Sequence, residues 1–594
     1  MLGTYFAFLL ILGLSALIGQ AIFALCGRRT WSRLSPAVGL AALSAIAWGT
    51  VRLPGEGTAA LIAIVVVAIA SAAYLRRRLD DLGRALRISV PLELAAVAIA
   101  SLPFIVAGRF GILGTGLDPD MSQHLLAASQ LAHGEGGNLI AAGYPLGPHS
   151  LVVAVSALGP SLVHAFDGLA LAVAVASCLV PLALFWRSSA ARRIAACLLV
   201  GLSYMGASYL VQGAFKESIE ALFVLAFAVG LHQLAAGELL PGTARPAIRA
   251  VPLAVLGIGA VYCYSFPGLL WLGGAAVLWA AAELALRPDA RAAVWRALTP
   301  LAGAVGLLVV ATAPEIGRMV DFASFQTFNP KGAGLGNLFN RISPLEALGI
   351  WPSGDFRVEP GGGFAPAIAF WLGAALAAAV LAWGLVWWLR RRELAVPAAL
   401  AAAALMIGYA LVAGTPYQEA KAIAIAAPLA TLIAVRPLVE GAVPAARAGI
   451  AAAVVFGLAA AGSTALALAN GPVGPATYSP KLTELRHELG GRSVLVLASP
   501  ELLADEHGRD YLVWELRGGR VCVGPEGPPS SAPPPVGISW VITPAATTKA
   551  PFVDLRLVRR SGPYALWERQ PRPVGGGGCP LIAPGGARAN PASG

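Results

Sequence analysis

The residues with the clearest chemical potential lie in the segment Leu117-Asp118-Pro119-Asp120. Two carboxylates this close together can exchange a proton with a substrate or share a cation. His124 follows Asp120 by four residues, so on a helix its imidazole would lie on the same face as that carboxylate. An aspartate at a helix start also accepts hydrogen bonds from free backbone amides, and proline suits the first helical position. Catalysis and helix capping are therefore both open for this pair.

The composition indicates which elements must position this segment. Of the 594 residues, 57% are hydrophobic and only 12% are charged, which is about half the charged fraction of a soluble protein. The apolar runs are continuous rather than alternating, which favours helices over a β-barrel. The sequence predicts an all-α polytopic membrane protein with about 14 transmembrane helices. These are expected at 3–26, 35–51, 58–75, 88–108, 163–186, 194–211, 217–235, 250–266, 268–286, 297–314, 366–389, 395–413, 420–437 and 447–468.

The distribution of arginine predicts the orientation of these helices. Clusters such as Arg76–Arg78 and Arg390–Arg392 fall on one side of the membrane if the spans alternate, and the positive-inside rule makes that side the cytoplasm. Both termini and the acidic segment then lie outside. The net charge of +11 needs no nucleic-acid partner, because cytoplasmic arginines facing anionic membrane lipid explain most of it. The Ala-, Arg- and Gly-rich composition predicts a multi-pass protein of the bacterial inner (plasma) membrane.

The predicted spans divide the chain into membrane and extracytoplasmic parts. We expect transmembrane helices in 1–108, 163–314 and 366–468, extracytoplasmic loops in 109–162 and 315–365, an extracytoplasmic α/β domain in 470–570, and a disordered tail in 571–594. The first of these loops carries the acidic motif and amphipathic helices. The α/β domain is predicted from strand-like runs at 493–498, 520–523, 538–542, 554–558 and 564–567 around a helix-like run at 501–517.

The long apolar helices, the acidic exported loop with amphipathic flanks and the exported C-terminal domain together resemble the GT-C superfamily of integral-membrane glycosyltransferases. Relatives include protein mannosyltransferases, lipid A aminoarabinose transferases and actinobacterial arabinosyltransferases. The resemblance covers most of the chain, but the loop here follows the fourth predicted span rather than the first. It implies transfer of a sugar from a polyprenyl-phosphate donor to an extracytoplasmic glycan, lipid or protein acceptor. An inverting mechanism would use Asp118 or Asp120 as the general base.

A transferase of this kind needs cations for the leaving phosphate, and outer-side cations are few. Lys421 is the preferred candidate because Pro416, Tyr417 and Glu419 crowd it in a short loop, and Lys216 is the second. A lysine at a helix end also serves as a snorkelling anchor, so both readings are open. The further phosphate-binding candidates in the predicted second loop are Lys331 and Arg341.

The supporting residues predicted for the site are His124, His149, Tyr417 and Glu419. The histidines near the acidic segment lack the short paired spacings of zinc sites, so no metal ligand is assigned. The aspartate pair could hold a divalent cation such as Mg²⁺ or Mn²⁺, although members of the superfamily often work without one.

Other classes of protein fit the same pattern. A flippase or transporter of a lipid-linked sugar would show an internal repeat with broken helices at matching positions, and inspection finds none. A polysaccharide polymerase or ligase would depend on arginine and histidine more than on an aspartate pair. A membrane scaffold would not need three sizeable exported polar regions.

Overall fold

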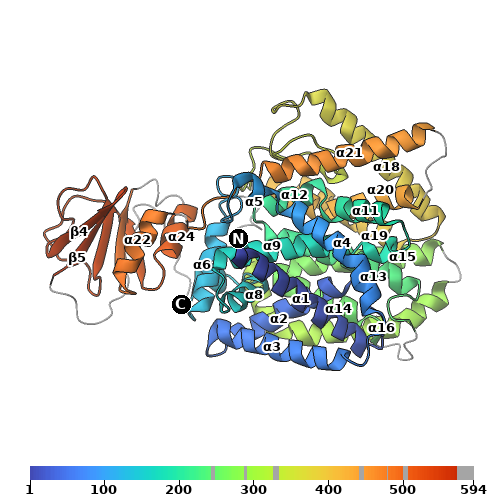
Figure 1. The fold of residues 1–594 in the computed structure, drawn as a ribbon, viewed down its shortest axis with the longest axis horizontal. Helices are drawn as coiled ribbons and strands as arrows, with labels where there is room; N and C mark the ends of the chain where they lie inside the picture. Colours follow the sequence, from blue (N-terminus) through green and yellow to red (C-terminus); the bar gives the residue numbers. More distant parts are fainter. Residues whose placement is uncertain are drawn as a thin grey trace. The chain divides into compact units, whose positions relative to one another are not determined.

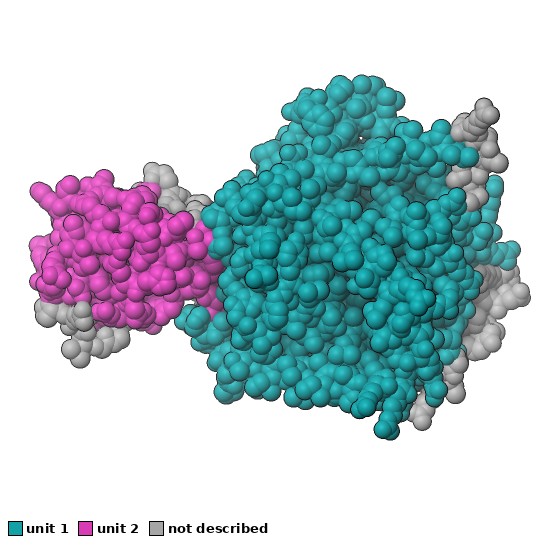
Figure 2. Space-filling view, viewed as in Figure 1, with its two compact units in different colours: residues 1–121, 130–476 teal, residues 122–129, 477–594 magenta. Residues whose placement is uncertain are grey.

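The computed structural model describes residues 1–241, 248–286, 290–325, 334–440, 447–477, 479–499 and 506–570 (Figure 1). The chain divides into two compact units, coloured separately in Figure 2. Unit 1 comprises residues 1–121 and 130–476, and unit 2 comprises residues 122–129 and 477–594.

Unit 1 is helical throughout. Its first half contains α1 (Leu2–Leu25), α2 (Ser35–Val51), α3 (Glu56–Leu75), α4 (Leu82–Ala100), α5 (Leu102–Ala107), α7 (Asn138–Ala141), α8 (Gly147–Ser156), α9 (Leu162–Leu179), α10 (Leu182–Phe185), α11 (Ala190–Gly201) and α12 (Tyr204–Val211). Its second half contains α13 (Phe215–Ala235), α14 (Val251–Tyr264), α15 (Phe266–Leu286), α16 (Ala290–Thr312), η2 (Ala313–Glu315), α17 (Ile316–Ala323), η4 (Pro344–Leu348), α18 (Ala367–Arg390), α19 (Ala395–Ala413), α20 (Pro416–Val439) and α21 (Arg447–Ala469). Helix α6 (Met121–Ala132) has residues in both units.

The described residues contain ten helices long and apolar enough to cross a membrane, so the chain is a multi-pass membrane protein. The number becomes eleven if α11 and α12, which meet at a 58° bend, form one span. The predicted number of about 14 is not confirmed. All fourteen predicted segments are helical, but α2 and α14 have only 17 and 14 residues. At 1.5 Å per residue they reach about 25 and 21 Å, short of a hydrocarbon core of about 30 Å. The segment predicted at 88–108 is divided between α4 and α5.

Three spans form the centre of unit 1. Helix α13 packs against both α9 and α20, and nearly all of α9 and α20 is buried. The outer helices α3, α15, α16 and α18 instead expose apolar side chains such as Val66, Val310 and Leu372, which suits contact with lipid. The short helix α8 is buried and packs on α2, α3 and α9. The N-terminal ends of α13 and α20, with the buried Lys216, Glu217 and Glu419, therefore lie in the interior of the bundle.

Unit 2 contains a five-stranded mixed sheet. Its elements after α6 are α22 (Pro480–Leu489), β1 (Val494–Ala498), α24 (Glu506–Glu515), β2 (Val521–Pro525), β3 (Trp540–Pro544), β4 (Leu555–Ser561) and β5 (Tyr564–Arg569). The strand order is β2-β1-β3-β5-β4, with β1 parallel to β2 and β3, and β5 antiparallel to both its neighbours. The predicted C-terminal α/β fold is confirmed.

The two faces of this sheet follow the period of two in strand side chains. Val494 and Val496 of β1 pack with leucines of α22 and α24, whereas Leu495 and Leu497 pack with Trp567 on the opposite face. The sequence missed α22, a polar helix whose N-cap Ser479 accepts a hydrogen bond from the Leu482 amide. The predicted tail 571–594 and the first residues of the helix-like run, 501–505, lie outside the described residues.

Candidate active site

A tight turn places the acidic segment. Gly114 has φ +78°, and a Cβ on it would lie 2.2 Å from the carbonyl oxygen of Gln212, so only glycine fits there. The amides of Leu117 and Asp118 both donate to the Gly114 carbonyl at 2.8 Å. The Gly114 amide in turn donates to the Pro472 carbonyl at 3.0 Å. The turn is thus fixed by α12 on one side and by the segment after α21 on the other.

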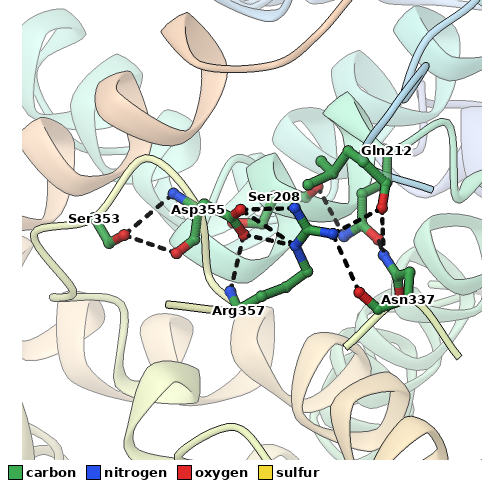
Figure 3. A network of polar contacts seen from close by, with 7 residues as sticks. Ser208, Gln212, Asn337, Ser353, Asp355 and Arg357 are labelled. Carbon is green, nitrogen blue, oxygen red and sulfur yellow. Dashed lines mark hydrogen bonds and ion pairs between the residues drawn. The ribbon is translucent and has the colours of Figure 1, made fainter. Parts of the chain in front are cut away.

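A polar network from the second predicted loop holds the backbone of the same segment (Figure 3). Arg357 Nη1 donates to the carbonyl oxygens of Leu117 at 3.0 Å and Asn337 at 3.1 Å, while its Nη2 pairs with Asp355 at 2.8 Å. Asn337 Nδ2 donates to Leu117 O at 3.1 Å and to Gln212 Oε1 at 2.9 Å. Asn337 and Arg357, which follow Leu117 by 220 and 240 residues, therefore both donate to its carbonyl oxygen. Neither Arg357 nor Asn337 was predicted to be a site residue.

The two aspartates are held differently. Asp118 is 4% exposed, and its Oδ1 accepts the Asp120 backbone amide at 3.1 Å. Asp120 is the N-cap residue of α6, but its side chain makes no capping hydrogen bond. Its Oδ2 instead accepts the hydroxyl of Tyr417 at 2.9 Å. The capping interpretation is therefore wrong for Asp120, and the structure brings the predicted Tyr417 and Asp120 together.

The environment of Asp118 favours its protonated form more than usual. Burial raises the pKa of the Asp118 carboxyl well above its ordinary value, and the nearby charge of Asp120 raises it further. The charge of Lys421 acts in the opposite direction but is the smaller influence. A carboxylate whose pKa is raised toward neutral pH is a stronger base than an exposed one, as general-base catalysis requires.

Two predicted lysines lie at the same level of the bundle. Lys421 Nζ of α20 is 3.0 Å from Glu217 Oε1 of α13 and 4.2 Å from the centre of the Tyr417 ring. Lys216 is buried, and its Nζ lies 3.7 Å from the centre of the Tyr144 ring. Both lysines are therefore held by aromatic faces rather than extending freely to water, contrary to the snorkelling alternative. The sequence did not assign Glu217, although its position beside Lys216 at a helix start was a usable signal.

The other two predicted phosphate-binding residues are Arg341 and Lys331. Arg341 Nη1 bonds to the fully buried Glu419 at 2.6 Å, and its Nη2 donates to the Gly414 carbonyl at 3.4 Å. These contacts tie the second predicted loop to the start of α20. Lys331 lies outside the described residues. A phosphate-binding role for either residue stays a prediction.

The two predicted histidines belong to different units. His124 lies on α6 in unit 2. His149 is fully buried in α8, where its ring contacts those of Tyr144, Phe166 and Phe215. Burial lowers the pKa of His149 to about 3, with Lys216 contributing, so this imidazole is neutral. Their supporting roles stay predictions.

Tyr144, which covers Lys216, is itself held by a cluster at the C-terminal ends of α2 and α16. Arg318 donates to the carbonyls of Ile140 at 3.0 Å and Tyr144 at 2.9 Å. Its guanidinium also lies 4.7 Å from the centre of the Trp48 ring, and Trp48 Nε1 donates to Glu315 at 2.8 Å. Residues of α2 and of the segment after α16 thus hold Tyr144 against the lysine.

The described residues contain no group of three or more His, Cys, Asp or Glu side chains arranged to hold a metal ion. A Mg²⁺ or Mn²⁺ ion at the aspartate pair stays a prediction. The geometry that is present combines a proton acceptor with a raised pKa, the buried side chain of Lys216 and the partly buried side chain of Lys421. Such a combination can take a proton from a hydroxyl group and stabilise an anion nearby.

We expect Arg357→Ala to lower activity through the backbone of Leu117 rather than through contact with substrate. The variant removes two hydrogen bonds that fix the acidic segment, and small misplacements of a catalytic group cost on the order of 10- to 100-fold in rate. Arg357→Lys keeps the charge but not the planar donors, so it should not restore the rate. Arg559→Ala, which alters an exposed pair in unit 2, is the control. Equal turnover in all three variants would show that the network is not needed.

No protein-family model and no curated protein matches the sequence. Among solved structures, the arabinofuranosyltransferase AftD from Mycobacteria is similar over 82% of this chain at 15% identity and TM-score 0.49, and a second AftD structure over 81% at 15% and 0.47. ArnT from Cupriavidus metallidurans, solved with undecaprenyl phosphate bound, is similar over 80% at 14% and 0.46.

This chain spans 40% of the AftD chain and 97% of the ArnT chain. AftD is an arabinofuranosyltransferase, and arabinosyltransferases are among the relatives named in the sequence analysis.

Proposed function

We propose that the protein is an integral-membrane glycosyltransferase that moves a sugar from a polyprenyl-phosphate donor to an extracytoplasmic acceptor. The observation that carries this proposal is the assembly of Asp118, Asp120, Lys216 and Lys421 at one level of the bundle, with Tyr417 bridging toward the acidic segment. These residues come from the first predicted loop, α13 and α20. The donor class comes from the sequence resemblance, and the acceptor is a cell-envelope glycan, a lipid or a protein.

In the proposed reaction, Asp118 is the general base. Its carboxylate takes the proton of the acceptor hydroxyl while the hydroxyl oxygen forms a bond to the anomeric carbon of the sugar. The bond between that carbon and the phosphate oxygen breaks, and the electron pair leaves on the lipid phosphate. The configuration at the anomeric carbon is inverted because attack and departure occur on opposite faces. Asp120 accepts the Tyr417 hydroxyl and lies beside Asp118, where its charge raises the pKa of the Asp118 carboxyl.

The lysines are proposed to receive the leaving phosphate. An ammonium group has three donors, so the contact between Lys421 and Glu217 leaves donors for a phosphate oxygen. Lys216 adds a second positive charge at the start of α13. Charge-assisted hydrogen bonds of this kind strengthen as negative charge develops on the leaving group.

The experiment that tests the proposal follows a radiolabel. Purified protein in liposomes receives a polyprenyl-phosphate sugar labelled in the sugar, together with a crude extracytoplasmic glycan and lipid fraction as acceptor. We expect the label to appear in a new product that is no longer bound to the carrier. A flippase would move the labelled lipid between leaflets without making a product, and that outcome would replace the transferase by the transporter alternative.

The proposed sidedness can be measured separately. Single cysteines introduced within 109–162 should react with a membrane-impermeant maleimide added to intact cells, whereas a cysteine near Arg391 should react only after permeabilisation. Labelling of both regions from the same side would contradict the placement of the acidic segment outside the membrane.

A further inference from the structure

A cleft in unit 2 is not used by the proposed chemistry. It has a volume of about 320 Å³ and lies at the carboxyl ends of β1, β2 and β3. This volume falls at the lower end of the range of about 300–1,000 Å³ found for small-molecule sites. Residues from all three strand ends line it, among them Leu497 at the end of β1, Glu526 and Gly527 after β2, and Thr543 and Lys549 at and after the end of β3.

The topology of the sheet explains why a cleft forms there. The chain leaves β1 for β2 on one side and then passes to β3 on the other side of β1, as the order β2-β1-β3 requires. The cleft lies above the ends of these three neighbouring strands, where the strand order reverses. In open α/β sheets this reversal of strand order is the usual position of a ligand.

The cleft has a floor of buried residues and walls formed by two loops. Leu497 and Thr543 are buried beneath it. The Thr543 hydroxyl is already engaged, since it accepts from Trp567 Nε1 at 2.9 Å and donates to the Pro544 carbonyl at 3.2 Å. The walls are the loops after β2 and β3, so ligand contacts would come from these loops rather than from the floor.

Hydrogen bonds join the two walls. Thr547 Oγ1 donates to Glu526 Oε1 at 3.3 Å, and the Ser530 amide donates to the Pro551 carbonyl at 2.8 Å. Arg560 Nη2 adds a bond to the Thr547 carbonyl at 3.2 Å. The cleft is therefore already formed without a ligand, which lowers the ordering cost of binding.

The side chains in the walls indicate the class of ligand. They offer the ammonium of Lys549, the carboxylate of Glu526 and the hydroxyls of Thr547 and Thr548. One positive and one negative charge leave no net charge, and donors and acceptors are both available. An anionic ligand would meet the carboxylate of Glu526. A neutral molecule rich in hydroxyl groups can satisfy both kinds of partner.

We propose that this cleft binds a sugar unit of an uncharged glycan. The proposal that this glycan is the acceptor of the transfer rests on the proposed function, whereas the proposal that the cleft binds a glycan does not. The unit 2 cleft would then select the acceptor independently of the charged residues in unit 1.

The test uses the full-length protein in detergent with no donor lipid. The probes are uncharged mannan, arabinan, galactan and glucan tetrasaccharides, with uronic-acid tetrasaccharides for comparison, and binding is measured by saturation-transfer NMR and titration. Gly527→Leu should fill the cleft, because a Cβ at Gly527 has nothing within 4 Å. Ala532→Leu adds the same side chain to the same loop at an exposed residue outside the lining. Lys549→Ala is paired with Lys481→Ala, a lysine on α22.

We expect the wild type, Ala532→Leu and Lys481→Ala to bind at least one uncharged tetrasaccharide. Gly527→Leu and Lys549→Ala should bind it at least about tenfold more weakly, which corresponds to about 1.4 kcal/mol. Binding of none of the uncharged probes, binding only of uronic acids, or equal binding by Gly527→Leu would overturn the proposal. Asp118→Asn should bind the glycan normally, so a loss of transfer with retained binding separates failure in the active site from failure of the cleft.

Discussion

Asp118→Asn is expected to lower the rate of sugar transfer by about 100-fold or more, the contribution of a general base. Asparagine keeps the shape of the side chain and can still accept the Asp120 amide through its carbonyl oxygen. It cannot take a proton from an acceptor hydroxyl. The measurement is single-turnover transfer of labelled sugar at saturating donor. The apparent KM for the donor should change little, because the lysines that receive the phosphate are unaltered.

The pH dependence of the wild type gives an independent readout of the same group. A base acts only when deprotonated, so the rate should fall as the pH drops through the pKa of Asp118. Burial and the charge of Asp120 raise that pKa, so the acidic limb should lie closer to neutral pH than for an exposed aspartate. Asp120→Asn removes the neighbouring negative charge, which should move the acidic limb to lower pH.

These variants also decide between the two aspartates. If Asp120→Asn abolished transfer and Asp118→Asn kept the full rate, Asp120 would be the base and Asp118 would serve only to shape the turn. Full activity in both single variants would remove the base from this segment altogether. Tyr417→Phe, which removes the hydroxyl bonded to Asp120, should give a smaller loss than either catalytic substitution.

Lys421→Met is expected to raise the apparent KM for the polyprenyl-phosphate donor on the order of 10- to 100-fold, since a charge-assisted hydrogen bond to phosphate contributes about 1.5–3 kcal/mol. The rate at saturating donor should also fall, because the same ammonium stabilises the leaving group. Donor binding is measured by titration with a non-hydrolysable polyprenyl phosphonate. Lys481→Ala in unit 2 is the control.

The ion pair between Lys421 and Glu217 affects how the Lys421→Met variant is interpreted. Removing one member of a buried ion pair leaves the other charge uncompensated, at a cost of about 3–5 kcal/mol in stability. Glu217, 3.0 Å from the ammonium, would be left in this state. The double variant Lys421→Met with Glu217→Gln should recover thermal stability but not donor affinity. Recovery of both would mean that the lysine serves the fold and not the phosphate.

The sequence alone determined the class of structure and the position of its most reactive segment. Continuous apolar runs predict membrane helices because only a helix satisfies its own backbone in lipid. Short strand-like runs bounded by turn residues predicted the strands of unit 2, including the fully buried β1. The pair Asp118 and Asp120 was visible because charged residues are scarce in so apolar a chain. These are local properties of neighbouring residues.

Only the tertiary structure decided which residues act together. The bond from Tyr417 to Asp120 joins positions 297 residues apart, and that from Arg357 to Leu117 joins positions 240 apart. Nothing in local spacing encodes such pairs, because they depend on which helix ends meet in the bundle. The number of spans shows the same limit, since α2 and α14 are as apolar as the longer helices but too short to cross alone. Composition selects helices for the membrane, and packing determines how far each one extends and which side chains face one another.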